Sequence, residues 1–440
     1  MAGRSSERHG HGGALCAALA TLLASGLLAS CGSGDGQGRT SLLIGDLVPL
    51  RGDLAKFGVA GRKSVDLAVA QARQAADAAG GELSVRVVHA DTETDEQIGE
   101  IVARQLVDDR DAGCMVGDWA AGGTFAIGAD VAAPESVPLI SPATTNADLS
   151  SLDDRGFVFR TAPSDDLQAE ALARLVARSI GSRGRSVSIA ARGDAYGRHF
   201  SQLFREAWQS LGGQAGEPLL YDAGRLNRHA DARRIVAGRP DAYVLIDFPD
   251  SFARLAPALL AEPGFDPSRL FFPDAMAGDD ARDNDISPAA VEGARGTLPG
   301  ATAPTSEGRF FDRIYRRDPQ PPRGQPGFDA AAFDAATLCF LGAVAAKSDK
   351  GPPIAEQLEA VSGPPGHEYG PARLAAAVRA LHAGREIDYQ GVSGPIDLDP
   401  AGDPQAAAFT AYVYREGRML HERAFLARRG ASGMPANGNP

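Results

Sequence analysis

The sequence predicts an α/β protein of two Rossmann-like lobes, each with a parallel sheet covered by helices. The chain has 440 residues, which is enough for two or three domains of ordinary size. Short apolar segments alternate with longer amphipathic segments, and this is the pattern of repeated β-α-β units. The alternation stops near residue 160 and then begins again. We therefore expect two successive lobes of similar design.

The first run of alternating segments contains four expected strands and three expected helices. The strands are short and apolar, at 41–45, 83–88, 114–116 and 138–140. The helices lie between them, at about 59–79, from 94 onward, and near 124–131. At the second of these helices, Thr94 is expected as the N-cap, with acidic residues following in the first turn.

The second run repeats this organisation with a different spacing. Strands are expected at 186–190, 241–246 and 270–272, and helices at 198–211 and about 251–260. Segment 157–165 is expected to be a strand that leaves the first lobe and enters the second.

The last third of the chain is less regular. It is expected to contain a Pro-rich connection at 318–324, a long Ala-rich helix at 328–346, a turn-rich segment at 394–403, and a hairpin formed by 407–414 and 419–426. The tail, residues 428–440, is rich in Gly, Ala, Pro and Asn, and we expect it to be disordered.

The N-terminus has the layout of an export signal. Arg4 and Arg8 precede an apolar stretch, and small residues lead to Cys31. The segment Leu28-Ala29-Ser30-Cys31 resembles the bacterial lipobox, in which the Cys is lipidated. This predicts a lipoprotein signal peptide at 1–30, a flexible tether at 31–40, and an extracytoplasmic protein anchored to a membrane. The alternative is an uncleaved anchor, although the apolar run is marginal for the roughly 20 residues of a membrane span.

Composition argues against several classes of protein. The chain has 44 Lys and Arg against 56 Asp and Glu, for a net charge of −12, whereas nucleic-acid binders normally present a basic face. Cys114 and Cys339 remain after the signal region, and we favour buried unpaired thiols for them. A disulfide between them stays open, because sequence alone does not place two Cα atoms within bonding reach.

A search for catalytic and metal-binding motifs finds no convincing match. The chain has no Gly-x-Ser-x-Gly elbow, no Walker A loop and no His-Glu-x-x-His, and its His residues share no ligand spacing. The acids Asp397, Asp399 and Asp403 superficially resemble a calcium loop, but a hairpin turn fits their spacing better. We therefore expect no enzyme, catalytic residue, cofactor or metal.

Candidate binding residues follow successive strands. In open α/β sheets, ligands bind in the crevice beyond the carboxyl ends of the strands. Gly122 belongs to a Gly-Gly-Thr helix start that offers backbone N–H groups to an anion, and Asp274 offers a negative charge to an ammonium group. The apolar part of a ligand would meet aromatic side chains, namely Phe57, Trp119, Tyr196 and Phe248.

The order of these segments resembles the type I periplasmic substrate-binding proteins of ABC importers, in particular the leucine/isoleucine/valine family. The segments are PLRGDLAKFG at 49–58, VPLISPATTN at 137–146, FRTAPSD at 159–165, DAYG at 194–197 and GPI at 394–396. The resemblance implies two lobes joined by a three-crossing hinge, with crossings near 161–164, 293–299 and 391–394. It places 41–162 and 296–392 in the N-terminal lobe, and 163–295 and 393–427 in the C-terminal lobe.

The resemblance also implies roles for individual residues. A ligand carboxylate would be held by the backbone N–H of Ala121, the backbone at Ala143 and the hydroxyl of Thr145, and an ammonium group by Asp274. The chain departs from leucine-type binders in three places: Ala121 replaces Ser, Asp274 replaces Glu, and Phe248 replaces Tyr. Trp119 is similar to a residue of relatives that bind urea or short amides.

The expected function is that of a monomeric, lipid-anchored receptor. It would bind an amino acid, in particular an aliphatic one, and deliver it to an ABC permease complex. Two alternatives remain open: the same fold binding urea or short amides or acting as a sensor, and an extracytoplasmic hydrolase.

Overall fold

The computed structural model describes residues 40–278, 280–299, 306–317 and 328–428. The expected signal peptide, the lipidation site Cys31, the Pro-rich connection at 318–324 and most of the C-terminal tail lie outside these residues.

The first lobe is built on a parallel sheet with the strand order β2-β1-β3-β4-β5 among the described residues. The strands are β1 (Thr40–Val48), β2 (Leu83–Asp91), β3 (Cys114–Val116), β4 (Leu139–Ser141) and β5 (Val158–Arg160). This order reverses direction between β1 and β3, and such a switch point is where open α/β sheets place their ligands.

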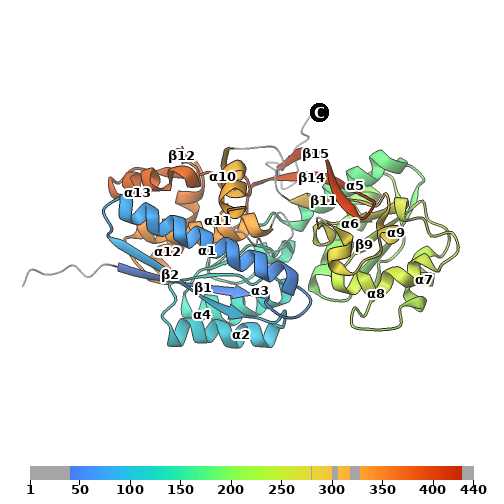
Figure 1. Cartoon of the computed structure of the whole chain (residues 1–440), viewed down its shortest axis with the longest axis horizontal. Coiled ribbons are helices and arrows are strands. Elements are labelled where there is room, and N and C mark those ends of the chain that lie inside the picture. The colour runs from blue at the N-terminus through green and yellow to red at the C-terminus, as the bar shows by residue number, and fades with distance from the viewer. Residues whose placement is uncertain (1–39, 279, 300–305, 318–327, 429–440) are drawn as a thin grey trace, which may run out of the picture. The chain divides into compact units, whose positions relative to one another are not determined.

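Helices cover both faces of this sheet. Along β1, Leu42 packs with Val65 of α1, whereas its neighbour Leu43 packs with Leu106 beyond α2. Because successive side chains of a strand point to opposite faces, α1 and α2 lie on opposite sides of the sheet, as Figure 1 shows. The helices from the N-terminal part of the chain are α1 (Ala55–Ala78), α2 (Glu96–Arg104) with its π-helical continuation η1 (Gln105–Asp109), α3 (Ala121–Ile127), η2 (Gly128–Ala132) and α4 (Ala133–Glu135).

The later part of the chain returns to the first lobe with a helical layer. Its elements are α10 (Ser306–Tyr315), α11 (Phe328–Ala346), α12 (Gly351–Ser362), β12 (His367–Tyr369), α13 (Leu374–His382) and β13 (Ile387–Tyr389). The helix α11 is long and apolar enough to cross a membrane, but 89% of its most apolar window is buried inside the protein. Because it is apolar on all sides, it behaves as the central core helix of this lobe.

The second lobe repeats the design of the first. Its sheet has the order β15-β14-β11-β10-β9-β6-β7, and β8 also pairs with β6. Its strands are β6 (Ser186–Arg192), β7 (Gln214–Ala215), β8 (Leu219–Tyr221), β9 (Ala242–Ile246), β10 (Leu270–Phe272), β11 (Arg295–Pro299), β14 (Ala406–Arg415) and β15 (Arg418–Arg428). Its helices are α5 (Asp165–Ile180), α6 (Ala195–Ser210), α7 (His229–Val236), α8 (Pro249–Leu260) and α9 (Pro288–Val291). The antiparallel hairpin β14–β15 extends an otherwise parallel sheet.

Two segments lie in a different lobe from the one that the resemblance implies. Residues 296–299, assigned to the N-terminal lobe, belong to β11 and pair in the second sheet. Residues 397–403, assigned to the C-terminal lobe, contact the first lobe: Leu398 N donates to Ser362 Oγ, and Arg160 N donates to Gly402 O. The chain enters the second sheet only at Ala406.

The N-cap of α2 also differs from the expectation. Asp95, not Thr94, caps this helix, because its carboxylate accepts hydrogen bonds from the N–H groups of Gln97 and Ile98. Thr94 has a positive φ of 57°, and its hydroxyl accepts from Leu54 N. The hydroxyl therefore holds the loop after β1 and is not used for the cap.

The expectation of unpaired thiols is wrong. Cys114 of β3 and Cys339 of α11 form a disulfide, with their Cα atoms 5.8 Å apart. The two residues are separated by 225 positions in the sequence, and they meet because α11 packs against β3 and β4.

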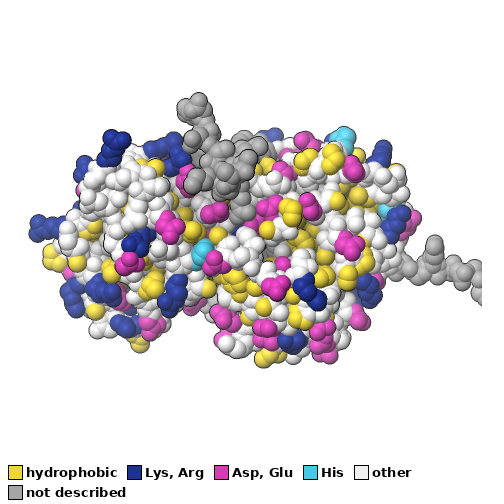
Figure 2. All heavy atoms as spheres, turned by 180° about the vertical axis from the view of Figure 1, so that it is seen from behind, with side chains coloured by type: hydrophobic (Ala, Val, Ile, Leu, Met, Phe, Trp, Pro, Cys, Tyr) yellow, Lys and Arg dark blue, Asp and Glu magenta, His cyan; other side chains and the backbone are white. Residues whose placement is uncertain are grey.

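Charged side chains cover the surface without a single-sign field on the face drawn in Figure 2. Lys and Arg occur there as separate groups, with Asp and Glu side chains between them.

Candidate ligand-binding site

A narrow pocket with a cavity volume of about 40 Å³ lies between the two lobes. Its walls come from the segments that follow β1, β3 and β4 in the first lobe and β6, β9 and β10 in the second. The lining residues are Leu54, Phe57, Trp119, Ala120, Ala121, Ala143, Thr144, Thr145, Tyr196, Phe248, Asp274, Ala275 and Phe328.

Eight of the nine binding residues predicted from the sequence line this pocket. The exception is Gly122, in the first turn of α3. A side chain at this position would meet the carboxylate of Glu96, so Gly122 faces α2 and not the pocket.

The first-lobe loops are joined by a network of hydroxyl groups. Ser141 Oγ donates to Asp118 O at 2.7 Å, and Thr124 Oγ1 donates to the same carbonyl at 3.1 Å. The hydroxyls of Thr124 and Thr144 are 2.6 Å apart. These bonds connect the loop after β3, which carries Ala121, to the loop after β4, which carries Thr145.

Asp118 is the buried centre of the loop after β3. Its Oδ1 accepts from Thr92 Oγ1 at 3.0 Å and from Trp119 N at 2.6 Å. Burial raises the pKa of its carboxyl group to about 7, although these hydrogen bonds oppose the rise. Gly123 is required beside it, because a Cβ there would lie 2.0 Å from Asp118 Oδ2.

Three aromatic rings form the apolar wall of the first lobe. Phe328 at the start of α11 packs edge-on against Phe57, at a centroid distance of 6.3 Å, and against Trp119, at 6.4 Å. The indole of Trp119 lies directly over Gly61 of α1, where a Cβ would come within 2.0 Å of the ring. Gly61 therefore makes room for the ring that lines the pocket.

The wall of the second lobe combines a stacked aromatic pair with an acid. Tyr196 and Phe248 stack at 5.6 Å, and Tyr196 OH donates to Asp274 Oδ1 at 2.9 Å. Asp274, in the short turn η5 (Asp274–Met276), is 2% exposed. Burial raises the pKa of its carboxyl group to about 6, and the hydrogen bond from Tyr196 partly opposes this.

A second buried acid lies behind this wall. Asp165 begins α5 and is fully buried, and its N–H donates to the carbonyl of Thr145 at 2.6 Å. Burial and the nearby Asp274 carboxylate raise the pKa of Asp165 well above its ordinary value. Because Asp165 and Asp274 are buried close together, the ionised form of one disfavours ionisation of the other.

Several lining residues were not expected from the sequence, of which Phe328 and Thr144 are the most informative. Phe328 is the first residue of the expected Ala-rich helix, and nothing local distinguishes a pocket residue from a core residue there. Thr144 precedes Thr145 in the segment VPLISPATTN, so its place at the pocket could have been predicted from its neighbour.

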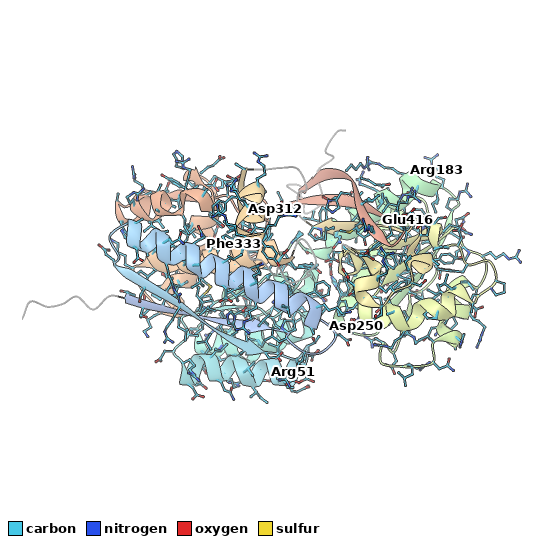
Figure 3. All side chains as sticks on the ribbon, in the orientation of Figure 1. Arg51, Arg183, Asp250, Asp312, Phe333 and Glu416 are labelled. Atoms are coloured by element: carbon cyan, nitrogen blue, oxygen red, sulfur yellow. A yellow bond between two sulfur atoms is a disulfide. The ribbon has the colours of Figure 1, made fainter. Side chains whose placement is uncertain are left out.

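Ion pairs and hydrogen bonds join the lobes around the pocket. Lys56 Nζ of α1 lies 3.3 Å from Asp250 of α8, and Figure 3 shows Asp250 beside the N-terminal end of α1. Arg192 pairs with Asp53 across the lobes at 3.0 Å, and its guanidinium lies 3.8 Å from the centre of the Phe248 ring. The aromatic wall of the second lobe is thus held between a cation and the pocket.

The chemistry of the lining is apolar with one acid. Among the described lining residues there is no Lys, Arg, His, Ser or Cys, and Asp274 is the acidic side chain. The described ranges also contain no group of three or more His, Cys, Asp or Glu side chains that could hold a metal ion. The arrangement suits a ligand with an apolar part, a cationic or hydrogen-bond-donating group near Asp274, and a polar group near Thr145.

Comparisons with known proteins agree with this architecture. Residues 41–411 match the model of the periplasmic binding protein family. The chain is 26% identical over 369 residues to the chemotactic signal transduction system substrate-binding protein BasB of Halobacterium salinarum, covering 82% of this chain and 84% of that protein.

Solved structures share the fold at lower sequence identity. The leucine-binding protein LivK of Thermotoga maritima is 20% identical with a TM-score of 0.70, covering 87% of this chain and 98% of its own. LivJ of Streptococcus pneumoniae, in complex with isoleucine, is 20% identical with a TM-score of 0.71 over 88% and 99% of the two chains. A solute-binding protein of R. palustris in complex with benzoate is 17% identical with a TM-score of 0.65 over 90% and 98%.

The family match covers nearly the whole described chain, and the solved structures share its overall fold. The chain belongs to the periplasmic binding protein family and has the type I fold of its solute-binding receptors.

Proposed function

We propose that this protein is an extracytoplasmic receptor, attached to a membrane by lipid at Cys31, that binds an aliphatic amino acid between its lobes and delivers it to an ABC importer. The observation that carries the proposal is the buried carboxyl of Asp274, which faces the neutral donors of the first lobe across an apolar pocket. An amino acid has matching features: an ammonium group for Asp274, a carboxylate for the Thr145 loop, and an apolar side chain for the rings.

Charge distinguishes this proposal from binding of an aromatic acid. Benzoate, the ligand of one structural neighbour, carries a negative charge and no cation. The described lining offers no Lys or Arg to balance that charge, and an ionised Asp274 would repel it. LivJ, whose ligand is isoleucine, has a zwitterion in its site, and a zwitterion fits a wall with one buried acid.

A second candidate is the same fold binding urea or a short amide, or serving as a sensor. Trp119 supports the amide alternative, because it is similar to a residue of relatives that bind urea or short amides. Its Nε1 is buried without a hydrogen-bond partner among the described residues. The chemotactic role in the name of BasB supports the sensing alternative. A neutral amide has no need of a negative charge, so Asp274 separates the amide from the amino acid.

A ligand panel tests the proposal. The chain from Gly32 onward, unfolded and refolded to remove carried-over solute, would be screened by thermal shift against leucine, isoleucine, valine, 4-methylpentanoate, benzoate, urea and acetamide. A ligand at 100 times its dissociation constant stabilises the protein by about 2.7 kcal/mol. We expect shifts with the aliphatic amino acids and none with 4-methylpentanoate, which lacks the ammonium group.

The variant Asp274→Asn sharpens this panel. It should weaken amino-acid binding by about 10- to 100-fold, because a hydrogen bond to a charged group contributes roughly 1.5–3 kcal/mol. Asp222→Asn, an exposed acid of the second lobe, serves as the matched control and should bind as the unchanged protein does. Unaltered amino-acid affinity in Asp274→Asn, or shifts only with benzoate or only with the amides, would overturn the proposal.

A further inference from the structure

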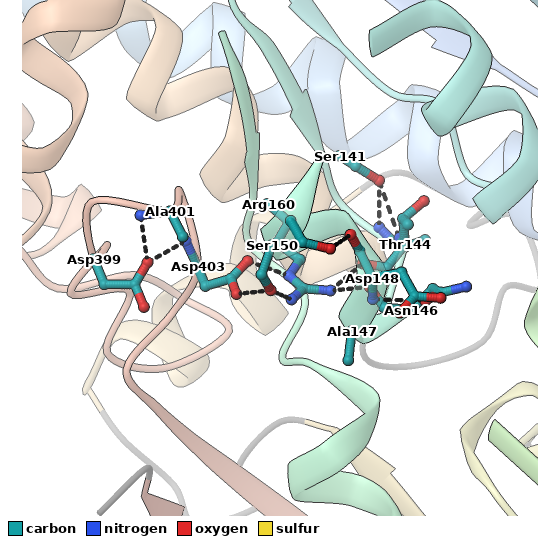
Figure 4. Close-up of polar contacts among 12 residues, drawn as sticks. Ser141, Thr144, Asn146, Ala147, Asp148, Ser150, Arg160, Asp399, Ala401 and Asp403 are labelled. Carbon is teal, nitrogen blue, oxygen red and sulfur yellow. Dashed lines mark hydrogen bonds and ion pairs between the residues drawn. The ribbon is translucent and has the colours of Figure 1, made fainter. Parts of the chain in front are cut away.

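Two acids of the turn-rich segment 394–403, Asp399 and Asp403, accept hydrogen bonds within the protein. Asp399 Oδ1 accepts from the N–H groups of Ala401, at 2.9 Å, and Asp403, at 3.1 Å. The N–H of Asp399 donates to Asp403 O at 2.9 Å. The turn is therefore closed by its own hydrogen bonds, and it directs the Asp403 carboxylate towards β5, as Figure 4 shows.

The partner of Asp403 is Arg160, the last residue of β5. Arg160 Nε donates to Asp403 Oδ1 at 2.6 Å, and the two side chains are 0% and 2% exposed. Ser150 Oγ bridges the pair: it accepts from Arg160 Nη2 at 3.0 Å and donates to Asp403 Oδ2. The ion pair is thus buried and its polar atoms are satisfied, as a stable buried pair requires.

The remaining donors of Arg160 point at the ligand loop. Nη1 donates to Asn146 O at 2.8 Å and lies 3.4 Å from Thr144 O. These two carbonyls flank Thr145, which lines the pocket. A guanidinium has five donors in a rigid plane, so one side chain fixes the backbone on both sides of Thr145 and still pairs with Asp403.

We propose that Arg160 and Asp403 are a positioning pair that holds the loop 142–146 in the geometry with which Thr145 meets the polar, carboxylate end of the ligand. The inference rests on the proposed function for the identity of that ligand. The pair spans 243 positions and anchors the loop to the turn that precedes the crossing into β14, so the pocket loop and the chain leading into β14 share one buried contact.

The test compares two ligands that differ only in the carboxylate, leucine and 3-methylbutylamine. In Arg160→Lys, which keeps the charge but loses the planar fork, leucine affinity should fall at least tenfold and the affinity for the amine less than twofold. Asp403→Asn, which keeps the shape of the side chain, should produce the same selective loss and serves if Arg160→Lys folds poorly. Affinities are measured by calorimetry at least 15 degrees below each variant's melting temperature.

Arg228→Lys is the matched control. Arg228 is also fully buried and pairs with Asp231 at 2.9 Å, but in the second lobe and away from the pocket lining. It should lower the melting temperature without changing the ratio of the two affinities. Equal losses for leucine and the amine in Arg160→Lys and Asp403→Asn would show a general structural role and overturn the inference.

A ligand-free measurement separates this inference from the proposed function. Hydrogen exchange of the peptide covering 142–150 should be at least tenfold faster in Arg160→Lys and Asp403→Asn than in the unchanged protein and in Arg228→Lys. Unchanged exchange of this peptide would overturn the positioning role even in a protein that binds leucine. Faster exchange in a protein that binds no amino acid would retain the role and reject the ligand.

Discussion

The two walls of the pocket differ in chemistry, although the two lobes repeat one design. The first-lobe wall has neutral polar groups, the hydroxyls of Thr144 and Thr145, and three rings packed edge-on. The second-lobe wall has a stacked pair of rings and the buried carboxyl of Asp274. Both lobes thus contribute aromatic surface, whereas the threonine hydroxyls come from the first lobe and the carboxyl group from the second.

This difference has a physical consequence for selectivity. A neutral wall accepts any ligand of suitable shape at modest affinity, whereas a buried acid discriminates strongly, because its charged form needs a partner. We infer that the second lobe decides which charge type is retained when both walls contact the ligand.

The largest expected effect concerns the covalent crosslink, which the first lobe has and the second lacks, since its residues include no Cys. Reduction of Cys114–Cys339 should destabilise the first lobe by about 2–5 kcal/mol, because the bond closes a very long loop in the unfolded chain. Thermal unfolding with and without dithiothreitol measures this. The double variant Cys114→Ala/Cys339→Ala should melt at the same temperature as the reduced protein, and its melting should no longer respond to the reductant. Identical melting of oxidised and reduced protein would contradict the disulfide.

The next effect tests the apolar wall of the first lobe. In Gly61→Ala the new methyl group would overlap the Trp119 ring, so we expect a loss of about 1–3 kcal/mol in the free energy of unfolding. The displaced indole should also weaken binding of the bulkier aliphatic amino acids more than that of valine.

The control for this substitution is Gly216→Ala, because a Cβ there meets nothing within 4 Å. Denaturant unfolding and calorimetric titration provide the two readouts. Stabilisation by Gly61→Ala, which its better helix propensity alone would produce, would show that the ring does not constrain α1.

The smallest effect tests the acid of the second lobe through pH. With a pKa of about 6, Asp274 is roughly nine-tenths ionised at pH 7 and one-tenth ionised at pH 5. Because the ammonium group needs the ionised form, amino-acid affinity should fall about tenfold between these values. The stability of the ligand-free protein should change in the opposite sense. Between about pH 4 and 6 the folded chain holds a proton that the unfolded chain releases, so the Asp274 contribution weakens folding as pH rises.

Asp274→Asn is the control that isolates this group, since Asp118 and Asp334 also have raised pKa values of about 7 and 6. Titration calorimetry at several pH values should give a flat affinity profile in the variant. A profile as steep as that of the unchanged protein would assign the pH dependence to another group.

Local patterns in the sequence were sufficient for much of the fold. The helix 328–346 has the bounds expected from its composition, and the hairpin β14–β15 agrees within a few residues. Such elements are predictable because hydrophobic period and turn residues act over a few positions. The N-cap of α2 was misassigned between Thr94 and Asp95, because both residue types cap helices and only the backbone angles distinguish them.

Local residue patterns indicate which segments form strands and helices, and they therefore also indicate which loops meet at the carboxyl ends of the two sheets. This is why Asp274, Thr145 and the aromatic residues could be named in advance. Tertiary structure alone decided the pairing of Cys114 with Cys339, the contact of Phe328 with the pocket, and the ion pair of Arg160 with Asp403. Each joins residues more than 200 positions apart, and such contacts depend on how whole helices and turns pack, which no local pattern encodes.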